Sequence, residues 1–145
     1  MTSRPLVIDT NVVLDIFLFD DAAAKPLKAL LETGTARWLA TQVMRDELER
    51  VLDYKHLQPR LVFYGLTPAD VLAGFDRFVE IVDTAAKAPV ACTDADDQKF
   101  IDLAVAHKAL LLSKDAAVLK TRRRLERLDV EVVKALPAGA LQDAN

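Results

Sequence analysis

The sequence contains a single cysteine, Cys92, which excludes an internal disulfide and a cysteine-rich zinc site and fits a reducing compartment. No stretch of about 18 residues is free of charge, so we expect no transmembrane helix. The first apolar stretch is short and soon reaches Asp9, which makes it a poor signal peptide. No glycine-rich phosphate loop is present, so nothing indicates nucleotide hydrolysis. These absences predict a soluble, cytoplasmic protein that does not contact a membrane.

An excess of positive charge is also lacking. The chain has 22 acidic and 19 basic residues, a formal net charge of −3, whereas a dedicated nucleic-acid binder is usually strongly basic. The charge is uneven, because Asp94, Asp96 and Asp97 crowd together and a basic strip lies downstream of them. The basic residues that could hold an RNA backbone are Lys114, Lys120, Arg122, Arg123 and Arg124. A solvated helix face explains the strip equally well.

The chain has 145 residues, of which 52% are hydrophobic, and no repeat or linker interrupts it, so we expect one domain over residues 1–145. Short apolar runs alternate with helical patterns. We expect strands at 6–8, 37–40, 79–82, 110–112 and 130–133, and helices at 12–17, 22–33, 41–54, from 67 onward, 94–107 and 116–127. This alternation predicts a three-layer α/β/α sandwich with a mainly parallel central sheet. The apolar stretch at 61–66 fits either a core or a dimer face.

Acidic residues directly follow two of the predicted strands. Asp9 follows the first strand, and Asp115 lies just beyond the strand at 110–112. In parallel sheets, ligands bind at the carboxyl ends of the strands, which is where both residues are expected. Each residue alone is also explained as a turn former or a helix cap.

Two further acids fall among apolar residues of predicted helices. On a helical wheel, Glu47 lies between Val43 and Val51 on the apolar half of its helix. Asp97 lies at the centre of an apolar arc, while Lys99 and Asp102 are expected to point away from it. A buried carboxylate is unfavourable unless something pairs with it. The alternatives are that Glu47 reaches water or an arginine, and that Asp97 forms a capping box with Asp94.

If the sheet brings these four acids within about 5 Å of each other, each pair repels by roughly 3 kcal/mol at an effective dielectric constant of about 20. Several such pairs would consume much of a domain's stability of about 5–15 kcal/mol. Protonation or a bound cation makes the arrangement tolerable. Carboxylate ligands without cysteine or clustered histidine favour Mg²⁺ or Mn²⁺ over Zn²⁺, and such sites serve phosphate-ester chemistry.

Four sequence blocks, LVIDTNVVLD, TQVMRDELERVL, CTDADDQKFIDLAVAH and LLLSKDAAVL, together with the closing VEVVKALPAGAL, resemble PIN-domain ribonucleases. The resemblance is to the VapC-like toxins of bacterial toxin–antitoxin pairs, and it covers nearly the whole chain. It implies a magnesium-dependent endoribonuclease (Mn²⁺ being the alternative ion) that acts on RNA and is often a homodimer. It also implies a cognate antitoxin that inserts a side chain such as arginine into the acidic pocket.

By position, Asp9, Glu47, Asp97 and Asp115 match the metal-binding and catalytic acids of that family. Asn11 and Ser113 match polar positions that orient the acids or a water molecule. Family members typically have a further aspartate where this chain has Ala117. That departure weakens a second metal site unless Asp94 or Asp96 compensates.

Other functions remain open at this stage. The chain could be a catalytically impaired PIN-fold module that binds RNA or a protein, for which Ala117 is the only sequence support. A phospho-acceptor receiver domain also gathers acids at strand ends, but the first strand here is followed by the single Asp9. A phosphatase with a D-x-D-x-T motif is disfavoured for the same reason.

Overall fold

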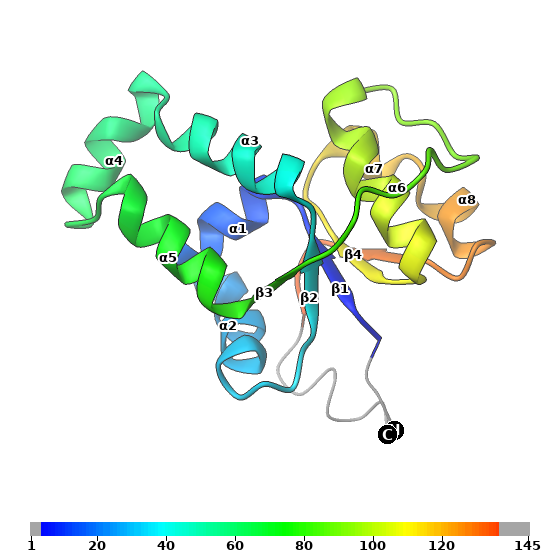
Figure 1. The fold of residues 1–145 in the computed structure, drawn as a ribbon, viewed down its shortest axis with the longest axis horizontal. Helices are drawn as coiled ribbons and strands as arrows, with labels where there is room; N and C mark the ends of the chain where they lie inside the picture. Colours follow the sequence, from blue (N-terminus) through cyan, green and yellow to red (C-terminus); the bar gives the residue numbers. More distant parts are fainter. Residues whose placement is uncertain (1–3, 137–145) are drawn as a thin grey trace.

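The structure, a computed structural model, describes residues 4–136. Its centre is a five-stranded sheet with the order β3-β2-β1-β4-β5, in which every pairing is parallel. The strands are β1 (Leu6–Ile8), β2 (Trp38–Ala40), β3 (Val79–Ile81), β4 (Leu110–Leu112) and β5 (Glu131–Val133). The predicted three-layer sandwich with a parallel sheet is confirmed, since helices cover both faces (Figure 1).

The order of the strands reverses at β1. From β1 the chain moves outward through α1 (Thr10–Phe17) and α2 (Lys25–Glu32) to β2, then through α3 (Gln42–Leu52) and α5 (Pro68–Phe78) to β3. It then crosses to β4 through α6 (Gln98–His107) and reaches β5 through α7 (Ala116–Leu119) and α8 (Arg122–Glu126). Because parallel crossovers are right-handed, the two series of helices lie on opposite faces (Figure 1). The carboxyl ends of β1 and β4 therefore flank the switch point where α/β proteins bind ligands.

The three central strands are buried on both faces. Every residue of β1, β2 and β4 is buried and apolar, which is the composition that a parallel sheet covered by two helical layers requires. Helix α6 packs against β1 and β4, and α1 packs against α2, α3 and α5. The central strands are thus rigid supports for the residues that follow them.

Three predicted helices start with a 3₁₀ turn or are divided in the structure. The helix at 22–33 starts with a 3₁₀ turn, η1 (Ala22–Ala24), and ends before Gly34, whose φ of 74° suits glycine. The helix at 94–107 starts with another 3₁₀ turn, η3 (Ala95–Asp97). The helix at 116–127 is divided into α7 and α8, because the buried Thr121 turns its hydroxyl onto the carbonyl of Val118 at 2.7 Å.

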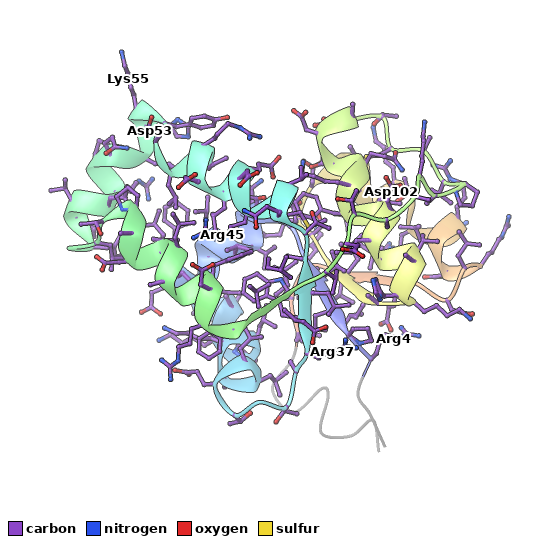
Figure 2. All side chains as sticks on the ribbon, viewed as in Figure 1. Arg4, Arg37, Arg45, Asp53, Lys55 and Asp102 are labelled. Carbon is purple, nitrogen blue, oxygen red and sulfur yellow. The ribbon has the colours of Figure 1, made fainter. Side chains whose placement is uncertain are left out.

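The stretch at 58–63 forms a short helix, α4 (Gln58–Phe63), which the sequence analysis did not assign. It follows η2 (Lys55–Leu57) and, with α3 and α5, forms a projection from the sheet (Figure 1). Leu61 is buried, whereas Val62 and Phe63 are 80% and 79% exposed. The helix has only six residues, so a periodic apolar pattern could not develop. The side chains of Asp53 and Lys55 point outward near the tip of this projection (Figure 2).

The segment between β3 and η3 is held against α6. A carboxylate oxygen of Asp102 accepts hydrogen bonds from the Ala88 N–H and from the Gln98 amide, each at 2.8 Å (Figure 2 labels Asp102). Gln98 also accepts a hydrogen bond from the Cys92 N–H at 2.7 Å and donates one to the Val90 carbonyl at 3.0 Å. These bonds fix the chain just before Asp94.

No helix among residues 4–136 is both long and apolar enough to cross a bilayer.

Candidate metal centre

Asp9 lies at the switch point between β1 and β4. Its N–H donates to the Leu112 carbonyl at 2.9 Å, and Ser113, which follows β4, donates its hydroxyl to Asp9 Oδ2 at 2.7 Å. Asp9 occupies the N-cap position of α1 and is 3% exposed, but its side chain makes no capping hydrogen bond to the helix. Burial raises the pKa of Asp9, and the hydrogen bond from Ser113 only partly opposes that rise.

Asp97 is buried at the start of α6 with one oxygen unpaired. It is 8% exposed, and its Oδ2 has no hydrogen-bond partner among the described residues. The prediction that Asp97 faces the apolar interior is therefore confirmed. Asp94 is an N-cap as the alternative proposed, since it accepts from the Asp96 N–H at 3.0 Å, but Asp97 makes no cap hydrogen bond and no capping box forms. Burial, with the nearby charges of Asp9, Asp115 and Asp94, raises the pKa of Asp97 to about 7.

Three carboxylates meet at this position. One oxygen each from Asp94, Asp97 and Asp115 lies within 4.8 Å of the others. The backbone directs Asp115 here, since its own N–H donates to Ser113 Oγ at 3.1 Å and its side chain accepts from the Ala117 N–H at 2.8 Å. The capping interpretation of Asp115 is thus confirmed without removing it from the acidic set. We call Asp94, Asp97 and Asp115 the acidic triad.

Glu47 lies outside the triad and is already bonded. Thr10 donates to its Oε1 at 2.5 Å, and the Lys99 ammonium donates to its Oε2 at 2.6 Å. The Glu47 side chain is 18% exposed, so it is half-buried as the wheel indicated, although Val43 beside it is 49% exposed. The alternative of an ion pair is correct in kind, with a lysine in place of an arginine.

Lys99, which was expected to point away from the apolar arc, turns its ammonium toward the acids. Its ammonium contacts both Glu47 and the Asp96 carbonyl oxygen. A helical wheel describes the direction of Cβ, whereas the four-carbon stem of lysine lets the ammonium reach back across the helix end. Asp102 does point away, toward the segment before η3. Lys99 and Thr10, which both donate to Glu47, are residues of this site that the sequence analysis missed.

A pocket of about 280 Å³ opens beside the acidic triad, and two members of the triad, Asp94 and Asp97, line it. We call it the acidic pocket, and its lining includes Asp9, Thr10, Asn11, Glu47, Arg50, Tyr54, Asp94, Asp96 and Asp97. Asn11 is exposed at its rim, and Asp96 lies beside Asp94. The predicted basic residues do not line it: Lys114 pairs with Asp15, and Lys120, Arg122, Arg123 and Arg124 are exposed along α7 and α8.

The chemistry of the triad suits a hard divalent cation. All of its donor atoms are carboxylate oxygens, and one buried oxygen of Asp97 lacks the partner that a buried polar atom normally has. No histidine or cysteine belongs to the cluster, so the softer donors that favour zinc or copper are missing from it. The triad could therefore hold an ion such as Mg²⁺ or Mn²⁺.

A comparison with family models gives a match to the PIN domain over residues 5–117. The chain belongs to the PIN-domain family. The match includes β1, the acidic triad, Asp9 and Glu47, and it ends before α8 and β5. No match was found among curated proteins. PIN domains are generally nucleases and typically use divalent metal ions, and that chemistry agrees with the donor set of the acidic triad.

The hydrogen bond between Ser113 and Asp9 offers a test of how this PIN domain is held together. We expect Ser113→Ala to lower the free energy of unfolding by about 1–3 kcal/mol, because it removes one hydrogen-bond donor from the buried Asp9 carboxylate. Chemical denaturation measures this loss. The same substitution in an Asp9→Asn background should cost clearly less. Equal losses in both backgrounds would show that this bond does not stabilise the fold.

Proposed function

We propose that this chain is an endoribonuclease that requires Mg²⁺ or Mn²⁺ and hydrolyses phosphodiester bonds of RNA. The observation that supports it most is the unpaired buried oxygen of Asp97 within a carboxylate triad at the switch point of a PIN domain. Such an oxygen is unfavourable unless a proton or a cation occupies it. The proposal explains why Asp97 is buried: its unpaired oxygen would bind the cation that the reaction needs.

The residues take separate roles in this mechanism. Asp94, Asp97 and Asp115 would hold the ion, and Asp9 adds negative charge beside them, oriented by Ser113. When bound, such an ion acidifies a coordinated water and offsets charge on the scissile phosphate.

In the proposed mechanism, carboxylates of the acidic pocket also bind and release protons. Without a cation, Asp97 is only partly deprotonated near neutral pH, because its pKa is raised to about 7. The Asp97 carboxylate would release that proton when the triad holds a cation. Glu47 and Asp97 are the two carboxylates that can accept the proton of the attacking water. Thr10 and Lys99 hold the Glu47 carboxylate in one orientation.

Asp94 supplies a third carboxylate to the site, although this chain has Ala117 where family members typically have an aspartate. The missing aspartate could indicate a catalytically impaired module that only binds RNA or a protein. The triad nevertheless has three carboxylates, because Asp94 approaches from the segment before η3. Ala117 contributes its backbone N–H to Asp115 instead of a side chain. This arrangement favours the catalytic function over the impaired module.

Cleavage of a structured RNA tests the proposed function. We expect the wild type to cut with Mg²⁺ or Mn²⁺ and to stop when EDTA removes the ion. Asp9→Asn should cut at least about 100-fold more slowly, since changes beside a metal site already cost about 10–100-fold. Asp53→Asn is the control, because the exposed Asp53 side chain points outward (Figure 2) and does not line the acidic pocket. Equal cleavage by Asp9→Asn and the wild type would contradict the proposal.

We further propose that the nuclease is the toxin of a toxin–antitoxin pair, with a small cognate antitoxin and a homodimeric state, as the resemblance to VapC-like proteins implies. The carboxylates of the acidic pocket would accept an arginine of the antitoxin. Co-expression with the product of the neighbouring reading frame tests this. We expect co-purification and relief of growth arrest. Harmless overexpression together with no binding by that neighbour would contradict the toxin role.

The basic strip on α7 and α8 gives a separate prediction about RNA binding. Lys120, Arg122, Arg123 and Arg124 are exposed and form no ion pair within residues 4–136. If the three arginines contact phosphates, replacing them with glutamine should reduce the slope of log Kd against log [salt] by about one unit per lost contact. Titration of Asp9→Asn protein with labelled RNA measures this slope. The control is Lys25→Gln/Lys28→Gln on α2, and identical slopes would identify the strip as a solvated face.

A further inference from the structure

A second hollow, of about 700 Å³, lies beside the acidic pocket between α1 and the α3–α4 projection. We call it the aromatic groove, and its aromatic lining consists of Phe19, Tyr54, His56 and Tyr64. The sequence contains only two tyrosines, and both lie here. The side chains are accessible, with Tyr54 49% and Tyr64 39% exposed. This is a concentration of exposed planar rings that core packing does not require.

The aromatic groove and the acidic pocket are continuous. Asn11, Val51 and Tyr54 line both of them. An RNA strand whose phosphate reaches the acidic pocket must pass over a neighbouring surface, and the groove is hollow enough to accept part of it. Pockets that hold small organic ligands have volumes of about 300–1,000 Å³. The groove therefore accommodates one or two nucleotides and is too small for a duplex.

A cationic side chain, Arg60, also lines the groove and can contact a phosphate or stack on a base. The Arg60 guanidinium lies 5.6 Å from the centroid of the Phe19 ring, and Phe19 meets Tyr64 edge-on, with centroids 6.5 Å apart. Arg60 forms no ion pair with any described carboxylate. The two acids in the lining are engaged elsewhere, since Lys114 pairs with Asp15, and Asp21 accepts from the Ala23 N–H at 2.9 Å.

We propose that the aromatic groove binds an unpaired nucleotide next to the scissile phosphate, with its base stacked on Tyr54 or Tyr64 and its backbone near Arg60. This inference rests on the proposed function, and it adds the residues that hold the nucleotide beside the cleaved bond, namely Tyr54, Tyr64 and Arg60. Aromatic rings stack on any base, so the groove selects for unpaired structure more than for sequence. A base inside a duplex cannot present its face to these rings.

RNA binding in EDTA tests the groove without relying on cleavage. The probe is a labelled single-stranded oligouridylate of about twelve nucleotides, compared with an RNA duplex of the same length. We expect tighter binding of the single strand, and Tyr54→Ala and Tyr64→Ala should each weaken it on the order of tenfold. Tyr64→Phe should bind nearly as the wild type does, because it keeps the ring.

Phe63→Ala is the matched control, because Phe63 adjoins Tyr64 on α4, is 79% exposed and does not line the groove. The emission of Trp38, which is 1% exposed, checks that each variant is folded. Unchanged affinity in both tyrosine variants would overturn the inference, and so would an equal loss in Phe63→Ala or equal binding of the duplex. A dimer that dissociates in Tyr64→Ala, with RNA affinity unchanged, would assign the groove to a second copy of the chain and also overturn it.

Hydrolysis of bis(p-nitrophenyl) phosphate separates this inference from the proposed function. That small diester can reach the acidic pocket without filling the groove. We expect Tyr64→Ala to hydrolyse it at the wild-type rate while showing a raised KM for single-stranded RNA. If neither compound is hydrolysed by the wild type but single-stranded binding still depends on the tyrosines, the nuclease function fails and the groove remains. If the wild type hydrolyses both the diester and the RNA, and Tyr64→Ala has an unchanged KM for RNA, the proposed role of the groove is wrong and the nuclease function stands.

Discussion

Asp97→Asn is expected to abolish RNA cleavage and to weaken binding of Mg²⁺ or Mn²⁺ by at least about 100-fold. The substitution keeps the shape of the side chain but removes the charge from the only member of the acidic triad that is buried. An amide is a poor ligand for a hard divalent ion compared with a carboxylate. Isothermal titration with Mn²⁺ measures the affinity. Tight binding by Asp97→Asn would show that the ion lies elsewhere.

The same variant should change how stability depends on pH. The pKa of Asp97 rises from 3.8 to about 7 on folding, so between these values the folded chain holds a proton that the unfolded chain has lost. The wild type without metal therefore loses stability as the pH rises through this window. In Asp97→Asn the side chain does not titrate, so this loss of stability with rising pH should be absent.

Thermal unfolding in EDTA from about pH 4 to about pH 8 measures the difference. We expect the stability of Asp97→Asn relative to the wild type to increase with pH, and Asp53→Asn should follow the wild type. A difference between Asp97→Asn and the wild type that does not vary with pH would contradict the assigned cause. Metal affinity in the wild type should rise over the same range, because the cation displaces the proton.

Lys99→Met is the second substitution with a large expected effect. It removes the ammonium that donates to Glu47 at 2.6 Å and leaves that half-buried carboxylate without its cation. We expect RNA cleavage to fall by about 10–100-fold, as it does when residues that orient a metal site are removed. Affinity for Mn²⁺ should instead be equal or higher, because the acidic pocket becomes more negative.

A fall in cleavage without a fall in Mn²⁺ affinity distinguishes a positioning role of Lys99 from simple loss of the metal site. Lys99→Arg should restore part of the activity, since it returns a cation that can pair with Glu47. Lys87→Met is the control, because Lys87 is exposed and does not line the acidic pocket. If Lys99→Met lowered metal affinity and activity together, Lys99 would hold the acidic triad in shape instead of orienting Glu47.

The sequence predicted those parts of the site that depend on short-range pattern. Asp9 and Asp115 follow buried apolar strands, and a parallel sheet brings such strand ends together. The burial of Asp97 could be read from its place among apolar neighbours three and four residues away. The parallel sheet and the helices on both of its faces follow from the alternation of strands and helices.

Other features depend on contacts that no local pattern encodes. Lys99 and Glu47 are 52 residues apart, and only the packing of α3 beside the start of α6 joins them. Asp94 enters the acidic triad because the turn before α6 is 3₁₀, which alters the direction of the side chains that precede the helix. The aromatic groove depends on α4, whose six residues are too few for a helical period to be recognised.

The most direct test of this account is a crystal structure of the protein grown with Mn²⁺ at about pH 8, above the pKa of Asp97. The account predicts an anomalous peak bonded to oxygens of Asp94, Asp97 and Asp115 at about 2.2 Å. A map with no peak between these three residues, or one with the peak bound only to other side chains, would contradict it.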